Sequence, residues 1–400
     1  MADPAPWGVH RGFGAYLHWP FCAKICPYCD FNVYAAKDRN TEPLLAAMLT
    51  DIRRQADRLT GHPPLQSIYF GGGTPSLLTG AEIRRFVDGL ERAFGLAPEP
   101  EITLEANPNA ITKDHVAAWR AAGINRLSVG VQSLNDEALT FLGRDHDAQT
   151  ARRAIETAVG AFPKISIDLM YARPGQTLNA WREELREAIG LGARHVSLYE
   201  LTIEPATPFG KAAARGQLLP MPDDDQADLY ELTNEIMTAH GLPAYEISNH
   251  AAEESDRSRH NLVYWRSGDW LGIGPGAHGR ITRGPARAAT FALRRPGDYI
   301  AAVEASDAFP GTTEPLSQLD AATEWLTMGL RTDEGLDSQG VRAAFGTALT
   351  APQLDQFVEN GWVRVANGRI ALTPDGRLLA DQISARLLEH LTESAADNGP

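Results

Sequence analysis

Six short runs of apolar and β-branched residues recur in the first half of the chain, and amphipathic segments of helical period lie between them. The runs span 15–19, 67–70, 101–105, 126–131, 164–170 and 195–201, and the amphipathic segments span 41–60, 79–95, 112–122, 134–160 and 177–191. Strands that alternate with helices form parallel sheets, because each crossover helix returns the chain to the same end of the sheet. The pattern predicts an α/β fold built on a partial (β/α)6 barrel. A doubly wound sheet is the alternative that periodicity leaves open.

The repeating pattern fades after Pro205. A helix is expected over 223–240, and further helices over 316–331, 337–345, 351–360 and 375–391. The two short runs 362–365 and 369–372 flank Asn367-Gly368 and predict a hairpin, so this last part resembles a winged-helix unit. The expected division is a disordered N-terminus (1–12), the barrel (13–220), an intervening segment (221–310), a helical, winged-helix-like C-terminal domain (311–393) and a disordered tail (394–400).

Composition narrows the class of protein. The chain has 37 basic and 51 acidic residues and a formal net charge of −14, which argues against a nucleic-acid-binding surface, including one on the winged-helix-like domain. No apolar run is long enough for a membrane-spanning helix, and residues 1–12 lack the apolar core of a secretion signal. Clustered thiols without paired partners fit a reducing compartment, so a cytoplasmic protein is expected.

All three cysteines of the chain, Cys22, Cys26 and Cys29, lie within eight positions. Three thiols cannot all pair as disulfides, and a closed zinc site needs a fourth ligand, which His18 would have to supply. Soft thiolates suit iron–sulfur clusters, and three of them would hold a four-iron cluster with one iron open to another ligand. The spacing favours the cluster, with zinc and inert buried thiols as the alternatives.

Polar residues stand at the end of each predicted strand. Because the carboxyl ends of parallel strands share one edge of a sheet, these residues predict a single ligand pocket. They are the cysteine segment, the loop Gly71–Pro75, and Glu105, Gln132, Asp168, Tyr199 and Glu200.

The C-x3-C-x2-C spacing, with Tyr28 just before the last cysteine, resembles the cluster motif of the radical S-adenosylmethionine superfamily. The segments 16–22 and 69–76 resemble the oxygen-independent coproporphyrinogen III oxidase group within that superfamily. Inside the group the chain looks most like the HemW branch of heme chaperones, and the likeness extends from about residue 13 to about residue 390.

The resemblance implies a 4Fe-4S cluster on the three cysteines, with S-adenosylmethionine bound to the remaining iron. It places the glycine loop at the amino group of S-adenosylmethionine, two tyrosines near its adenine, and Arg144 at its carboxylate. The complete set that it implies for S-adenosylmethionine is Tyr16, Tyr28, Gly72, Gly73, Thr74, Glu105, Gln132, Arg144 and Asp168.

One departure separates the chain from the oxidases, which carry a further cysteine two residues after the motif. Here Asp30 follows Cys29, and Phe31 occupies the position of that cysteine. The oxidases also have a longer segment before the motif. Both differences put coproporphyrinogen oxidation in doubt and agree with the chaperone branch.

A second motif concerns heme. His260-Asn261-Leu262-Val263-Tyr264-Trp265 resembles the heme-associated motif of the chaperone branch, which makes His260, Asn261, Tyr264 and Trp265 candidate heme contacts. His278, in a glycine-rich loop, is the alternative iron ligand.

The sequence therefore predicts a heme chaperone that binds heme and passes it to apo-hemoproteins such as respiratory-chain cytochromes. A radical enzyme acting on a tetrapyrrole is the alternative. Membrane-bound respiratory subunits are among the candidate heme acceptors, and the sequence does not single one out.

Overall fold

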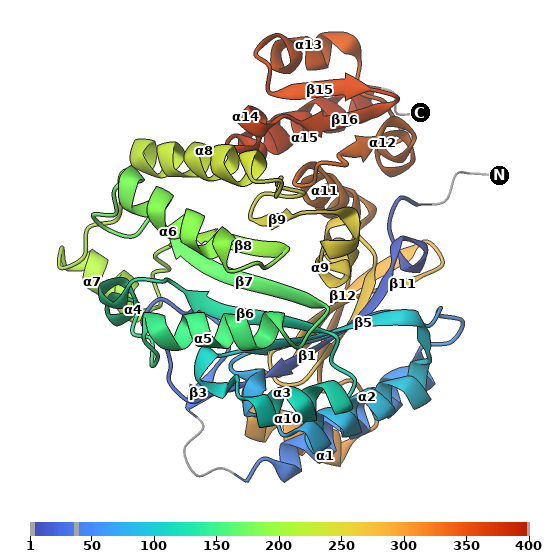
Figure 1. Cartoon of the computed structure of the whole chain (residues 1–400). Coiled ribbons are helices and arrows are strands. Elements are labelled where there is room, and N and C mark those ends of the chain that lie inside the picture. Colours follow the sequence, from blue (N-terminus) through green and yellow to red (C-terminus); the bar gives the residue numbers. More distant parts are fainter. Residues whose placement is uncertain (1–4, 36–39, 398–400) are drawn as a thin grey trace.

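The computed structural model describes residues 5–35 and 40–397. Its main feature is an open sheet of eleven strands in the order β13-β12-β11-β10-β1-β4-β5-β6-β7-β8-β9, which crosses the middle of the molecule (Figure 1). The strands are β1 (Phe13–Trp19), β4 (Leu65–Gly72), β5 (Leu96–Ala106), β6 (Arg126–Gln132), β7 (Lys164–Tyr171), β8 (His195–Glu200), β9 (Asn249–Ala251), β10 (Asp269–Ile273), β11 (His278–Arg283), β12 (Ala286–Ala292) and β13 (Gly311–Pro315).

The strands β1, β4, β5, β6, β7 and β8 are parallel and follow one another in chain order. A doubly wound sheet would reverse its strand order at a switch point, so this order confirms the partial barrel and excludes the alternative. The sheet does not close, because β9 and β13 form its two edges.

Side chains on the barrel strands alternate between two environments. On β4, Ile68 and Phe70 pack into the main apolar core with helix residues such as Phe86, whereas Ser67 and Tyr69 point to the concave side. The crossover helices are α1 (Glu42–Arg58), α2 (Gly80–Phe94), α3 (Lys113–Ala121), α4 (Asp136–Phe141), α5 (Ala148–Val159) and α6 (Leu178–Gly190).

The helix expected over 134–160 is two helices, because the chain breaks between α4 and α5. Gly143 there has φ +66°, and a Cβ at this position would lie 2.6 Å from Cδ of Pro27 in the cysteine loop. The left-handed turn therefore requires glycine and brings the next residue, Arg144, against that loop.

Residues 221–310 are not a separate segment but part of the sheet. β9 pairs with β8 at one edge, and β10 lies parallel to β1 at the other, followed by the antiparallel strands β11, β12 and β13. Short strands paired with a distant edge leave no repeating pattern in the sequence, which explains why they escaped prediction. The helices of this region are α7 (Pro208–Ala214), α8 (Asp223–Ala239), α9 (Arg259–Trp265) and α10 (Pro296–Ala305).

The C-terminal unit starts at α11 rather than at residue 311, since β13 belongs to the main sheet. It has its own apolar core, and the predicted hairpin is present as β15 and β16. Its elements are α11 (Gln318–Leu330), β14 (Leu336–Asp337), α12 (Ser338–Phe345), α13 (Ala351–Glu359), β15 (Val363–Ala366), β16 (Arg369–Leu372), α14 (Pro374–Arg377) and α15 (Ala380–Asp397).

Disorder was expected at both ends, and the expectation is wrong for the described residues there. Trp7 is buried in the C-terminal core, and a short 3-10 helix follows at Val9–Arg11. An indole that fills an apolar core fixes the backbone around it. Helix α15 continues to Asp397; residues 1–4 and 398–400 lie outside the described part.

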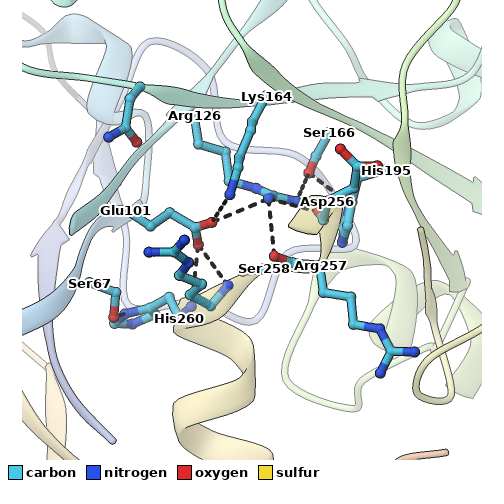
Figure 2. Close-up of polar contacts among 12 residues, drawn as sticks. Ser67, Glu101, Arg126, Lys164, Ser166, His195, Asp256, Arg257, Ser258 and His260 are labelled. Carbon is cyan, nitrogen blue, oxygen red and sulfur yellow. Dashed lines mark hydrogen bonds and ion pairs between the residues drawn. The ribbon is translucent and has the colours of Figure 1, made fainter. Parts of the chain in front are cut away.

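The amino-terminal half of the barrel interior is filled by a buried ionic network (Figure 2). The Glu101 carboxylate lies 3.3 Å from Arg126 Nη1 and 3.5 Å from Lys164 Nζ, and it accepts hydrogen bonds from the backbone N–H groups of Arg259 and His260. Arg126 in turn donates to the carbonyl oxygen of Asp256. The network therefore attaches the start of α9 to the floor of the barrel.

Within the described residues, no helix is both long and apolar enough to cross a bilayer.

Candidate functional site

A cavity of about 520 Å³ opens at the carboxyl ends of the barrel strands, where the pocket was predicted. Its walls come from the loops after β1, β4, β5, β6, β7 and β8, which are far apart in the sequence. Of the predicted residues, it is lined by Cys22, Cys26, Cys29, Tyr28, Gly72, Gly73, Thr74, Pro75, Glu105, Gln132, Arg144, Asp168, Tyr199 and Glu200.

The three cysteines face this cavity from one loop, which begins at the short strand β2 (Phe21–Cys22), itself paired with β3 (Tyr34–Ala35). Cys22 and Cys26 are buried, and Cys29 is half-buried. Within the described residues no three His, Cys, Asp or Glu side chains are already placed around a single ion position. Three thiols that line one cavity fit a multi-iron cluster.

Burial favours the protonated form of the Cys22 and Cys29 thiols. It raises the pKa of Cys29 to about 11 and also raises the pKa of Cys22. Because the thiolate is the ligand, binding of a cluster here must release protons from the thiols.

The glycine loop packs directly on the cysteine loop. A Cβ at Gly73 would lie 2.7 Å from the carbonyl oxygen of Phe21, and the N–H groups of Gly73 and Thr74 donate to the carbonyl oxygens of Trp19 and Phe21. The N–H of Gly72 donates to Glu105 Oε2 at 3.2 Å. These backbone amides are therefore engaged within the protein. An ammonium group would instead have to meet carbonyl oxygens, which accept hydrogen bonds.

Gln132 enters the cavity through an irregularity in β6. The pairing of β6 with β7 shifts register between Gly130 and Gln132, and Gln132 has φ +67°. A bulge of this kind turns a side chain that would otherwise follow the strand alternation, and the left-handed backbone of a non-glycine residue stores strain at the site.

Arg144 is half-buried beside the cysteines, and part of its guanidinium is unused. Nη2 donates to the carbonyl oxygen of Gly130 at 2.8 Å, and Nη1 lies 3.3 Å from Cys26 Sγ. Its Nε is buried without a hydrogen-bond partner among the described residues. A buried guanidinium with an open N–H fits a carboxylate ligand, as the resemblance implies.

Two acids line the inner wall of the cavity. Burial raises the pKa of Glu105 to about 7 and that of Asp168 to about 6, although hydrogen bonds from neighbouring groups lower both pKa values. Tyr69 donates its hydroxyl hydrogen bond to Glu105 at 2.9 Å, and Ser128 donates to Asp168 at 2.9 Å. Two carboxyl groups of raised pKa in one cavity favour a cationic or hydroxyl-bearing ligand, which would supply the missing partners.

Asp168→Asn should stabilise the protein without cofactors, and the gain should depend on pH. The folded pKa of Asp168 is higher than its unfolded value, so its contribution to stability is complete below about pH 4 and is lost as the pH rises through about 6. Above that pH the variant should be more stable by on the order of 2–3 kcal/mol. Urea unfolding of both proteins at pH 4.5 and pH 8 tests this, and an equal difference at both values would contradict it.

Two residues that sequence reasoning associated with the site lie elsewhere. Tyr16 does not line the cavity; its ring lies in the barrel interior beside Tyr69, and its hydroxyl is 3.2 Å from His18 Nδ1. His18 Nε2 lies 2.9 Å from the carbonyl oxygen of Asn32. Because both ring nitrogens of His18 are engaged, the histidine needed for a zinc site is already occupied.

The predicted heme motif forms helix α9, which closes the barrel interior at the amino-terminal ends of the strands. His260 is buried, with Nδ1 2.9 Å from Ser67 Oγ and Nε2 2.6 Å from the Tyr264 hydroxyl. Trp265 lies under the guanidinium of Arg331. The backbone N–H of Asn261 donates to Oγ of Ser258, the residue that caps the start of the helix. Of the four motif residues, His260 and Tyr264 contact each other, and none of the four lines the cavity.

Sequence reasoning missed several lining residues. Tyr69 and Met170 lie within strands, and Asn107 and Thr202 follow strand ends. The signal for Tyr69 is its alternation with apolar residues on β4, because polar positions at period two mark the concave side of the sheet.

Comparison with protein families finds two matches. Residues 16–188 match the model of the Radical SAM superfamily, and residues 316–379 match the model of the HemN C-terminal domain. The first range covers the cysteine loop and the barrel strands through β7, and the second covers most of the C-terminal unit.

Individual proteins are similar over nearly their full length. The heme chaperone HemW of Escherichia coli is 35% identical, with 92% of this chain and 96% of the relative covered; that of Bacillus subtilis is 33% identical, with 94% and 99% covered. Bovine (Bos taurus) radical S-adenosyl methionine domain-containing protein 1, mitochondrial, is 34% identical over 100% of this chain and 92% of the relative. The solved structure of coproporphyrinogen III oxidase (HemN) from E. coli shares the fold, with a TM-score of 0.78, 24% identity, and 97% and 92% of the chains covered.

Proposed function

The chain belongs to the HemW family of the radical S-adenosylmethionine superfamily, and from this premise we propose that it is a heme chaperone. It binds heme and transfers it to apo-hemoproteins, among them respiratory-chain cytochromes. The observation that carries the proposal is the likeness to chaperones of this name over more than nine-tenths of the chain.

The cofactors we propose are a 4Fe-4S cluster and S-adenosylmethionine. The cluster would be held by Cys22, Cys26 and Cys29, and it supplies an iron position that the protein leaves open. The cavity beside it offers the unpartnered Nε of Arg144 for a carboxylate, and the acids Glu105 and Asp168 for polar or cationic atoms. These residues would bind and orient the cofactor. The hydrogen bonds between the glycine loop and the cysteine loop fix the positions of the two loops relative to each other.

The alternative is a radical enzyme that acts on a tetrapyrrole, since the cavity is lined by all the residues implied for S-adenosylmethionine except Tyr16. The side chain of Phe31 favours the chaperone. It stands at the position where the oxidases carry an additional cysteine, it lies at the rim of the cavity, and it is 61% exposed to solvent. An exposed phenylalanine cannot bind a metal and is well suited to contact an apolar macrocycle or a partner protein.

Two assays on anaerobically reconstituted protein test the proposal. Heme titration should show saturable binding with a shifted Soret band, and transfer of that heme to an apo-cytochrome should follow. Coproporphyrinogen should not be turned over in the presence of reductant and S-adenosylmethionine. Turnover without heme binding would replace the chaperone with the radical enzyme.

Arg144→Ala should weaken S-adenosylmethionine binding, because a buried guanidinium paired with a carboxylate is lost. The expected cost is about 1.5–3 kcal/mol, measured by equilibrium dialysis with the cluster intact. Arg153→Ala is the matched control: this arginine lies on the exposed face of α5, contacts Thr150, and should not affect binding. Equal affinity of the Arg144 variant and the parent protein would contradict the assignment.

A further inference from the structure

Resting on the proposed heme binding, we infer that the heme iron is bound by His278, on the concave face of the sheet beside the cavity, and not by His260. His278 is the first residue of β11 and is exposed. The reasons come from which imidazoles are accessible, from the strand register around His278, and from the charges near it.

His260 is closed off on every side as the protein is folded. Figure 2 shows its ring against Ser67, and its own backbone N–H is bound by Glu101. The ring also stacks on Tyr69 with a centroid separation of 5.0 Å, and its second nitrogen contacts Tyr264. A heme iron could reach it only if both hydrogen bonds broke and α9 left the barrel, together with the ionic network that anchors its first turn.

His278 has none of these constraints. Among the described residues neither of its ring nitrogens has a hydrogen-bond partner, while its backbone oxygen is held by Trp270 Nε1 at 3.0 Å. The backbone is thus fixed and the imidazole is left open. Burial and the cations Arg280 and Arg294 lower the pKa of His278, which keeps the imidazole in the neutral form that binds metals.

The strand register places His278 in a row across the concave face. Tyr16 pairs with Gly272, and His278 pairs with Phe291, whose ring lies edge-on at 4.8 Å. Gly272 lies between Tyr16 and His278 in this row. It has to be glycine, because a Cβ there would lie 2.3 Å from the carbonyl oxygen of His278. The row therefore has no side chain at Gly272, and the edge of the Phe291 ring beside the exposed His278 suits a flat apolar ligand.

The charge and the neighbouring loops fit the same ligand. Heme carries two carboxylates, and Arg294 is exposed and close enough to influence the pKa of His278. Asn32 donates hydrogen bonds to the carbonyl oxygens of Pro275 and Arg294, which ties the loop that carries Phe31 to the edge of this surface. Heme on His278 would therefore lie next to the mouth of the cofactor cavity.

The test is heme titration of the full-length, cluster-loaded protein and of three variants. His278→Ala should lose the Soret band of the imidazole complex and bind heme at least about tenfold more weakly, and added free imidazole should restore the band. His260→Ala should keep the parent spectrum, although it should unfold more easily. His240→Ala is the matched control: this exposed histidine ends α8 and bonds to the carbonyl oxygen of Ile236.

The outcomes separate this inference from the proposed function. If the parent protein binds no heme, the chaperone proposal fails. If the parent binds heme and His278→Ala has the same affinity and spectrum, His278 is not the ligand and only this inference fails. Loss of the band in His260→Ala alone, with cluster content and circular dichroism unchanged, would assign the iron to the α9 motif instead.

Discussion

A Cys26→Ser variant should contain almost no iron after anaerobic reconstitution, whereas the parent protein should contain about four irons per chain. The chain has no other cysteine that could replace the lost ligand, because all three lie in this one loop. Serine fills nearly the same volume at a buried position, so the fold should persist while the thiolate is missing. Iron and acid-labile sulfide analyses, together with the visible spectrum, measure the result.

Cys22→Ser and Cys29→Ser should behave alike, since the three residues act as one ligand set. A circular dichroism spectrum equal to that of the parent protein is the control for folding. Parent protein that binds one zinc ion and neither iron nor sulfide under anaerobic conditions would overturn the cluster assignment. So would any single variant that keeps four irons.

Glu101→Gln should destabilise the protein by about 3–5 kcal/mol, because it leaves a buried arginine without its counter-charge. Arg126 and Glu101 are each 1% exposed in their side chains, so water cannot replace the lost partner. The substitution also weakens the acceptor for the two backbone N–H groups at the start of α9. Urea unfolding followed by circular dichroism should show a clear decrease in the midpoint.

The double variant Glu101→Gln with Arg126→Met should be less destabilised than the sum of its single variants, because both charges are then gone. Glu42→Gln is the matched control. Glu42 forms an ion pair with Arg85 at 2.7 Å, but on the exposed surface between α1 and α2, and its loss should leave the midpoint nearly unchanged. Equal effects of the buried and exposed substitutions would show that the network does not hold α9 in place.

Both predictions depend on a barrel whose interior is polar. Barrels of this type usually fill their interior with layers of branched apolar side chains. Here the inner positions carry residues such as Ser67, Arg126 and Asp168, and the apolar residues of the same strands face the helices. The half of this interior at the amino-terminal ends of the strands is filled by the network around Glu101. The half at the carboxyl ends forms the cofactor cavity.

The sequence alone determined the six barrel strands, the crossover helices and the position of the cavity. Period-two and helical patterns are local properties, and the carboxyl ends of parallel strands meet at one edge whatever the side chains are. The proposed ligand set for a cluster was equally local, because the three cysteines lie within eight residues of one loop. The C-terminal hairpin followed from its turn residues, whereas the break at Gly143 was not predicted.

The tertiary structure decided what pattern could not. The strands β9 to β13, within residues 249–315, joined the sheet because an open barrel leaves edges with which short segments can pair. Such pairing between distant segments produces no local period in the sequence. Gln132 reached the cavity through a bulge, whereas Tyr16 and His260 were turned into the barrel interior. The sequence does not show whether the ring nitrogens of a histidine are free or hydrogen-bonded. Only the packing of α9 against β4 shows that His260 is enclosed and His278 is open, because accessibility depends on contacts between residues that lie far apart in the chain.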